Sequence, residues 1–566
     1  MPLAIHTDAE KRVVKPDAAE KLTATAARAG ITLNTRCGGQ GHCQGCRCYL
    51  MAGRFRVGTQ ELEPAREGLP ALVRACQTSL LSTHGEICFP HSSVVEYRAQ
   101  IDDVLDLPAA GQLNWRPVGE PAAPYGVAVD IGTTTVVAVL VDLRDGTVLD
   151  KASMYNQQIG RADDVASRIS YATTPEKLAE LQTLVLDKTI NRLIQILCSR
   201  HKIKRHAVGR LVVSGNTVMT HLFYGLSPET IGRIPFNPVT RSYADQPAAA
   251  LGVDIHPDAT VSALPSVSGY IGGDLVADMY VIGLPQRATT TLLVDIGTNG
   301  EMILQHNGQL TACATAAGPA FEGAGLSSGC RAAEGAIEAV TNRPDGLLEW
   351  KVIGHTAPKG ICGSGVVDFL AAGLRAGWLN ARGRFDVAQL RALKRYHAAG
   401  QPDQPVHSFL LAPAEESLTG EPVYVSEYDV AQVLKAKGAI FAGLVTLLER
   451  VGLTFQDLDR IELAGGFAKH LNLTNAVHIG LLPDIPLDRF KVVGNGSLAG
   501  AYRGLMEEGA LAQCDGLIDR PQIVELNLEP SFEANFIDAL SLPHLDLDWF
   551  PGFAQRNGHS EPLEQI

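Results

Sequence analysis

One pattern of residues occurs twice in this chain, and it limits the folds that the chain can adopt. Residues 127–142 read VAVDIGTTTVVAVLVD with a turn signal at Asp145-Gly146, and residues 293–304 read LVDIGTNGEMIL with Asn307-Gly308 behind them. Each copy is an apolar strand, a tight D-I-G-T turn and a second apolar strand that ends in a hairpin turn. The copies lie 165 residues apart, so we expect two related lobes that face one another.

The D-I-G-T turns have the composition of a phosphate-binding site. Small residues let the turn bring backbone N–H groups against phosphate oxygens, threonine hydroxyls add donors, and the aspartates can hold Mg²⁺ directly or through water. The chain contains neither a Walker-type G-x-x-x-x-G-K-[ST] loop nor a dinucleotide G-x-G-x-x-G fingerprint. The residues that we expect to contact ATP are Asp130, Gly132, Thr133, Thr134, Asp295, Gly297, Thr298 and Asn299.

Two glycine-rich segments, LAGGFAKHLN at 463–472 and GNGSLAGA at 494–501, follow the turns in order. Together these four features resemble the acetate and sugar kinase, Hsc70 and actin superfamily. The resemblance implies a two-lobed, actin-like (ribonuclease H-like) ATPase that closes over ATP, with adenosine against Gly465 and Gly466. The alternative is a degenerate actin-like fold that has lost its nucleotide.

Long helices are expected between the apolar strands, at 174–200 and 426–452. Ser426 and Asp429 form a capping arrangement at the start of the second helix. Strands that alternate with helices predict an α/β architecture for this part of the chain.

The cysteines are concentrated near the N-terminus. Cys37, Cys43 and Cys46 have the spacing C-x5-C-x2-C, and Cys76 follows after 29 residues. The plant-type [2Fe–2S] pattern is C-x4-C-x2-C with a distant fourth cysteine, so this chain has one extra residue in the first gap. We expect these four thiolates to hold a [2Fe–2S] cluster and Cys48 to be a bystander. Zinc is the alternative, although structural zinc sites usually pair two C-x2-C knuckles.

A ferredoxin motif ahead of an actin-like ATPase resembles the reductive activators of corrinoid enzymes. The resemblance covers nearly the whole chain and includes the blocks VSGNTVMTHLFYG, AAGPAFEGAGLSSGCRAAEGAIE, GICGSGVVD and LKAKGAIFAG. It implies a β-grasp ferredoxin-like domain and an enzyme that uses ATP to drive one electron from the cluster onto Co(II), which regenerates Co(I). The implied partners are a corrinoid protein or corrinoid-dependent methyltransferase, an external low-potential reductant and a second copy of the chain in a homodimer.

The candidate catalytic residues are Asp130, Asp295, Ser327 and Ser328. The two serines have two interpretations: they face the partner's corrinoid or the nucleotide phosphate, or they cap a helix at a tight loop.

The alternative function is a small-molecule kinase with an appended redox-sensing ferredoxin domain. A dehydratase activator would need a cysteine pair in the ATPase half, and an Hsp70-like chaperone would need a longer C-terminal domain than the residues after Asp515 allow.

Composition limits the partners and the compartment. The net charge of −13, with no block of basic residues, argues against nucleic acid. No run of 18 apolar residues occurs and the N-terminus lacks the apolar core of a signal peptide, so we expect a cytoplasmic protein without a membrane span.

The expected multidomain α+β and α/β chain has a ferredoxin-like domain at 1–95, a proline-rich linker at 96–125, a middle domain at 126–210 and a C-terminal ATPase domain at 211–566.

Overall fold

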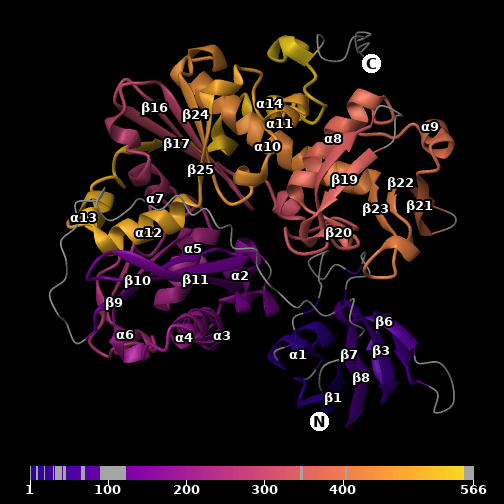
Figure 1. Ribbon diagram of the computed structural model, residues 1–566, viewed down its shortest axis with the longest axis horizontal. Helices are drawn as coiled ribbons and strands as arrows, with labels where there is room; N and C mark the ends of the chain where they lie inside the picture. The colour runs from indigo at the N-terminus through magenta and orange to yellow at the C-terminus, as the bar shows by residue number, and fades with distance from the viewer. Residues whose placement is uncertain are drawn as a thin grey trace.

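The structure of the chain is a computed structural model (Figure 1). It describes residues 2–7, 11–17, 19–29, 31, 33, 41, 46–64, 71–89, 93, 123–162, 164–343, 348–401 and 404–553. The linker expected at 96–125 lies outside these ranges except for its last three residues.

In the part that the structure describes, the N-terminal domain is a mixed sheet that shares its core with the helix α1. The strand order is β2-β1-β8-β3-β6, in which β1 and β8 are parallel and the other neighbours are antiparallel. The strands are β1 (Leu3–His6), β2 (Lys11–Val14), β3 (Arg47–Ala52), β6 (Ala71–Arg74) and β8 (Gly85–Cys88), and α1 is Leu22–Arg28. A second small sheet contains β4 (Phe55–Val57), β5 (Gln60–Leu62) and β7 (Thr78–Leu80). This is the expected β-grasp arrangement.

The first lobe is built on a six-stranded sheet of order β11-β10-β9-β12-β14-β13. Its strands are β9 (Tyr125–Ile131), β10 (Thr135–Asp142), β11 (Thr147–Tyr155), β12 (Val208–Gly215), β13 (Gln246–Pro247) and β14 (Thr260–Ala263). Its helices are α2 (Val165–Tyr171), α3 (Pro175–Val185), α4 (Asn191–Arg200), α5 (Thr217–Tyr224), α6 (Ala248–Leu251) and α7 (Gly273–Val281). The helix expected at 174–200 forms as α3 and α4 with one π-helical turn, Leu186–Ile190, between them.

The second lobe repeats this plan with a sheet of order β25-β24-β15-β16-β17-β26. Its strands are β15 (Thr291–Ile296), β16 (Gly300–His306), β17 (Gln309–Thr315), β24 (Arg460–Ala464), β25 (Phe490–Gly494) and β26 (Pro521–Ile523). In both lobes a three-stranded antiparallel meander has a parallel strand against its first strand. The turn at Asn307 and Gly308 has φ values of 50° and 79°, as the Asn-Gly pair predicts. The expected repeat of two hairpins is confirmed.

Two small sheets complete the second lobe. They contain β18 (Ala336–Asn342), β19 (Leu348–Val352) and β20 (Gly360–Ile361), and β21 (Tyr396–Gln401), β22 (Gln404–Ala412) and β23 (Val423–Ser426). The remaining helices are α8 (Gly363–Ala376), α9 (Val387–Ala392), α10 (Glu427–Val451), α11 (Leu473–His478), α12 (Gly496–Met506), α13 (Ala510–Asp515) and α14 (Phe532–Asp538). The expected capping box of Ser426 and Asp429 is present at the start of α10.

The division expected after residue 210 falls inside β12 and not between domains. The strands β12 and β14 hydrogen-bond into the first sheet, so the first lobe continues to the end of α7, and the second sheet begins with β15. Near the C-terminus the chain returns to the first lobe, since α12 packs on β9 and β12 and lies beside α7 (Figure 1). The two lobes therefore share a core around α7 and α12.

Among the described residues one helix, α10, is long and apolar enough to cross a membrane. Of its apolar window, 83% is buried inside the protein, as in the core helix of a folded domain.

Candidate nucleotide site and iron–sulfur domain

The first D-I-G-T turn joins β9 to β10 and is held by side chains of the first lobe. Arg168 donates to the carbonyl oxygen of Thr133, and Asn216 Nδ2 donates to the Thr133 hydroxyl at 3.0 Å. A Cβ atom at Gly132 would lie 2.3 Å from the carbonyl oxygen of Thr135, so the turn requires glycine there. The turn therefore presents a fixed set of backbone and hydroxyl groups.

The second turn joins β15 to β16 in the same way. Gly297 N donates to the carbonyl of Asn299 at 2.9 Å, which closes the turn. Gly318 N donates to the carbonyl of Thr298 at 2.8 Å and ties the turn to the segment after β17. The two predicted phosphate-binding turns thus have equivalent positions at the ends of two equivalent strands.

The LAGGF segment begins in the last two residues of β24 and lies beside the second turn. Gly465 has φ 91°, and a Cβ atom there would lie 2.5 Å from Asp295 Oδ1, so glycine is needed for this close approach. Gly465 N donates to the carbonyl of Gly494 at 3.1 Å. A side chain at Gly466 would meet no described protein atom within 4 Å, so this backbone is open to a ligand.

Five carboxyl groups gather behind the two turns. They are Asp130, Asp274, Asp278, Asp295 and Glu301. Burial raises the pKa of each, and in four of them the charges of other members raise it further. Such a cluster favours a cation, yet the part of the chain that the structure describes contains no group of three or more His, Cys, Asp or Glu side chains placed to hold a metal ion.

The GNGSLAGA segment anchors Asp130 from the start of α12. Asn495 Nδ2 donates to Asp130 Oδ2 at 2.9 Å, and the Ser497 hydroxyl donates to Asp130 Oδ1 at 2.8 Å. A Cβ atom at Gly496 would lie 1.8 Å from Asp278 Oδ1, so the helix approaches the acidic cluster as closely as its backbone allows. Sequence reasoning noted this segment but missed Asn495, Ser497 and the three acids that packing adds to the cluster.

A further carboxylate, Glu322, contacts both turns. Its Oε2 accepts from the Thr134 hydroxyl at 3.0 Å, and its Oε1 accepts from the Thr298 hydroxyl. The sequence pattern did not identify Glu322, which is one acidic residue within the glycine-rich block AAGPAFEGAGL. Its contact with Thr134 arises only when folding brings the segment after β17 to the turn of the first lobe.

The candidate serines make hydrogen bonds at the start of α10 and in β23. The backbone N–H and hydroxyl of Ser327 donate to Asp429 Oδ1 at 2.7 and 3.0 Å. The Ser328 hydroxyl accepts from Tyr424 N at 3.0 Å, and the residue is 3% exposed. Neither serine is the N-cap of α10, which is Ser426. These hydrogen bonds hold the loop that contains Ser327 and Ser328 against α10 and β23. A catalytic role for either serine stays a prediction.

Two of the four predicted cluster ligands lie in the described part of the N-terminal domain. Cys46 precedes β3 and Cys76 lies in the short 3-10 helix Ala75–Gln77. Both are buried, and Ala75 N donates to the Cys46 carbonyl at 2.8 Å, which brings the two segments together. Cys37 and Cys43 lie outside the described residues. The four-cysteine ligand set therefore stays a prediction.

Cys48 lies within β3 and is buried in the core of the N-terminal domain. Burial, with smaller effects from Cys46 and Cys88, raises the pKa of its thiol far above the ordinary value. Cys48 is therefore a thiol of the domain core within the described residues, and its role as a bystander stays a prediction.

Among the described residues, two ion pairs join the N-terminal domain to the two lobes. Arg161 of the first lobe pairs with Glu20 at 3.1 Å, beside α1. Arg47, the residue after Cys46, pairs at 2.7 Å with Glu421, which lies just before β23 of the second lobe. In Figure 1 the N-terminal domain accordingly sits below β20 and β23 and next to the first lobe. The segment that carries Cys46 is thereby connected directly to the second lobe.

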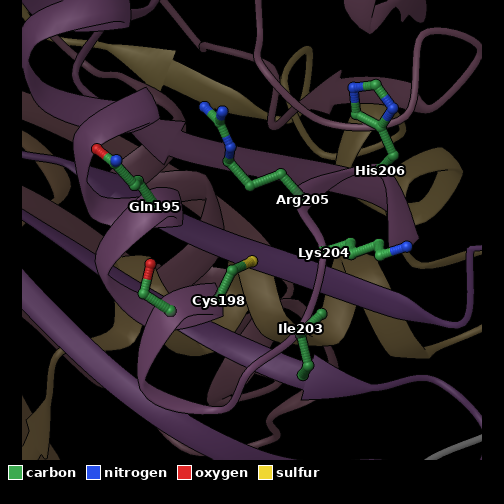
Figure 2. Close-up of a pocket in the computed structure, with 7 residues that line it drawn as sticks. Gln195, Cys198, Ile203, Lys204, Arg205 and His206 are labelled. Carbon is green, nitrogen blue, oxygen red and sulfur yellow. The ribbon is translucent and has the colours of Figure 1, made fainter.

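A separate cavity of about 450 Å³ lies on the first lobe, where α4 leads into the short helix Arg205–Ala207 (Figure 2). Its lining residues are Gln195, Cys198, Ser199, Ile203, Lys204, Arg205 and His206. Arg205 is neutralised by an ion pair with Asp254. The lining includes none of the predicted nucleotide or cluster residues, so the cavity is not part of the candidate site.

Three protein-family models match the chain in an order that follows this architecture. A 2Fe-2S iron-sulfur cluster binding domain matches residues 5–81. The RACo middle region matches residues 125–287, and the C-terminal domain of RACo, the ASKHA domain, matches residues 289–554.

Two curated relatives and one solved structure are similar over most of the chain. The corrinoid activation enzyme RamQ of Eubacterium limosum is 32% identical over 486 residues, which are 85% of this chain and 79% of the relative. The [Co(II) methylated amine-specific corrinoid protein] reductase of Methanosarcina barkeri is 26% identical over 68% of this chain and 71% of the relative. The solved structure of a reductive activator for corrinoid, iron-sulfur protein has a TM-score of 0.71 at 32% identity, and the match covers 97% of this chain and 100% of that chain.

Proposed function

The chain belongs to the RACo family, and on this premise we propose that it is an ATP-dependent reductive activator of a corrinoid protein. It transfers one electron from its iron–sulfur cluster to Co(II) and regenerates Co(I). The observation that carries the proposal is the joining of a 2Fe-2S domain to a two-lobed ASKHA domain in one chain, with ion pairs between them. A small-molecule kinase would not need this connection.

The need for ATP follows from reduction potentials. Plant-type clusters lie near −400 mV, and free Co(II) corrinoids are harder to reduce. In a one-electron step each 59 mV of mismatch changes the equilibrium about tenfold. Conformational work from ATP can overcome the mismatch if it changes the axial ligation of cobalt while the two proteins are bound.

The iron–sulfur cluster is assigned to Cys37, Cys43, Cys46 and Cys76. The buried, adjacent positions of Cys46 and Cys76 support this donor set, because thiolates shielded from water suit such a cluster. The cluster would supply one-electron chemistry. The protein's own contribution is to hold the cluster loop against the second lobe, since Arg47 follows a ligand directly and pairs with Glu421.

ATP is assigned to the two turns and to Gly465 and Gly466, and Mg²⁺ to the acidic cluster behind them. Asp130 and Asp295 hold equivalent positions on β9 and β15, and burial raises the pKa of both, so a bound cation would favour their charged forms. Mg²⁺ commonly keeps several waters and uses one or two carboxylates plus substrate phosphates. Binding through only one or two carboxylates agrees with the described residues, in which no three His, Cys, Asp or Glu side chains are placed to hold a metal ion together.

The N-terminal domain is proposed to swing between an external low-potential reductant and the corrinoid. The proline-rich composition of residues 96–125 supports this motion. The test is a variant in which the linker at 96–125 is shortened. An unchanged rate of electron transfer in this variant would exclude the swing.

The remaining assignments are proposals of the same kind. We expect a cytoplasmic location, where thiols stay reduced, a corrinoid protein or a corrinoid-dependent methyltransferase as partner, and a homodimer through the ATPase half.

The test is whether oxidation of the reduced cluster requires both a Co(II) corrinoid protein and ATP. The reconstituted protein is incubated with ATP, with and without a Co(II) corrinoid protein, and phosphate release is followed together with the cluster's electron paramagnetic resonance signal. The proposal expects the reduced-cluster signal to disappear only when both the corrinoid protein and ATP are present. Phosphate transfer to a small metabolite, with no effect of any corrinoid protein, would support the kinase alternative.

A further inference from the structure

Glu322 lies at the end of a short, rigid segment. It is the last residue of the 3-10 helix Pro319–Glu322, and the flanking residues Gly318 and Gly323 have φ values of 80° and 73°. A Cβ atom at Gly323 would lie 2.1 Å from the carbonyl oxygen of Cys330, so the segment cannot easily take another path. The preceding residue is buried and stacks on the LAGGF phenylalanine, with 5.1 Å between the ring centres of Phe321 and Phe467. The direction of the Glu322 side chain is therefore set by packing.

The carboxylate of Glu322 accepts hydrogen bonds from one threonine of each turn. Thr134 belongs to the first lobe and Thr298 to the second, so one carboxylate joins the two lobes at their phosphate-binding turns. Arg331, on the segment that follows, lies 4.4 Å from the ring centre of Tyr155 in the first lobe. The whole segment thus crosses from the second lobe to the first at this point.

Glu322 is distinct from the five acids behind the turns. Asp278 and Glu301 are buried, and Asp130, Asp274 and Asp295 are partly exposed. Charges within this group raise the pKa values of four of its members, as expected of groups that share a cation. Glu322 is partly exposed, and its oxygens meet threonine hydroxyls and not other carboxylates. The carboxylates at the turns are therefore of two kinds. The five acids form a cluster suited to a cation, and Glu322 accepts hydrogen bonds from the threonine hydroxyls that we expect to contact phosphate.

From this placement we infer that Glu322 is the catalytic carboxylate of ATP hydrolysis. It accepts a proton from the attacking water while the water oxygen bonds to the γ-phosphorus. The bond from that phosphorus to the β,γ-bridging oxygen breaks, its electron pair leaves with ADP, and the proton passes from Glu322 to the released phosphate. The inference deepens the proposed function and rests on it only for ATP binding between the two turns. Because the carboxylate needs a hydroxyl from each lobe, hydrolysis is tied to the arrangement of both lobes.

The decisive variant is Glu322→Gln. Glutamine has nearly the same shape and can still hydrogen-bond to Thr134 and Thr298, but its amide cannot accept the water's proton. General base catalysis typically contributes on the order of 10²- to 10⁴-fold. We expect kcat for ATP hydrolysis to fall at least about 100-fold by that principle, while the Kd for a fluorescent ATP analogue stays close to that of the parent protein. Glu334→Gln, at an exposed position of the same connecting segment, is the matched control and should hydrolyse ATP normally.

A purely structural role predicts a different result. If Glu322 only clamps the turns, Glu322→Gln keeps the parent kcat, and that outcome overturns the inference. Glu322→Asp provides a second check, because a shorter carboxylate should recover part of the lost kcat if proton transfer matters. Thermal melting and the cluster absorbance of each variant are compared with those of the parent protein, so that misfolding is not read as lost catalysis.

The same preparations separate this inference from the proposed function. A parent protein that hydrolyses ATP but forms no Co(I) contradicts the proposed function, while loss of hydrolysis in Glu322→Gln still supports the inference. A parent protein that forms Co(I), beside a Glu322→Gln variant that hydrolyses ATP at the parent rate, contradicts the inference alone.

Discussion

The ion pair between Glu20 and Arg161 should hold the N-terminal domain against the first lobe. The Arg161 and Glu20 side chains are 14% and 7% exposed. Arg161 is also paired with Glu180 of its own lobe at 2.7 Å, and Glu20 with Arg28 of its own domain at 2.7 Å. Each partner is therefore already oriented before the two domains meet.

The energy of this contact follows from its burial. Exposed ion pairs contribute about 0.2–1 kcal/mol, whereas breaking a fully buried pair costs about 3–5 kcal/mol. The pair lies between these limits, so we expect a coupling of about 1–3 kcal/mol in a double-mutant cycle with Glu20→Gln and Arg161→Gln. That energy corresponds to a change of roughly 5- to 150-fold in the ratio of docked to free domain.

The assay is energy transfer between two fluorophores introduced as unnatural amino acids, one at exposed Arg56 of the N-terminal domain and one at exposed Lys202 of the first lobe. Each single variant should lower the transfer efficiency, and the double variant should lower it less than the two effects combined. A coupling energy below about 0.3 kcal/mol, within the error of such cycles, would refute the reasoning.

The pH dependence of this contact has a definite sign. Burial raises the pKa of Glu20, but hydrogen bonds from the Asp17 backbone and the Thr25, Arg161 and Arg28 side chains outweigh it, so the pKa lies below the ordinary 4.5. The stabilisation is thus fully present above pH 4.5 and is lost as the pH falls through the lowered pKa. Docking should be unchanged between pH 6 and 8.

Three further predictions concern the cluster, the metal and the core. Cys76→Ser should lose the visible absorbance of the cluster while Cys48→Ser keeps it, and equal loss in both would contradict the ligand set. Asp295→Asn should weaken Mg²⁺-dependent binding of an ATP analogue and leave the cluster spectrum intact, and Mg²⁺ titrations that match the parent's would argue against the metal assignment. Lys437 is fully buried and donates to the carbonyls of residues 539, 541 and 543. Because Lys437→Met leaves three buried acceptors without their donor, it should lower the free energy of unfolding by about 2–4 kcal/mol, and denaturation by guanidinium at an unchanged midpoint would disprove this.

Features encoded locally were predictable from the sequence. The two meanders follow from alternating or continuous apolar residues bounded by Asp-Gly and Asn-Gly turns, and the structure confirms them. The start of α10 was predictable because a capping box is a contact between neighbours, here Ser426 and Asp429. The α/β alternation then placed both turns at the ends of buried strands.

Features that depend on packing were not predictable in this way. Asp274, Asp278 and Glu301 reach the acidic cluster from α7 and β16, and no spacing in the chain relates them to Asp130. The division at residue 210 failed because β12 joins its sheet through parallel pairing with β9, a contact between residues far apart in sequence. Glu322 meets Thr134 across 188 positions of the chain.

The central claim is that ATP and the cluster together reduce cobalt in a partner protein. The most direct measurement is the anaerobic absorbance of a Co(II) corrinoid protein mixed with this protein and a reductant, with and without ATP. We expect the Co(I) spectrum to appear only when ATP and an intact cluster are both present, and to be absent with Cys76→Ser. Co(I) formation that proceeds equally without ATP, or with the cluster removed, would contradict the account.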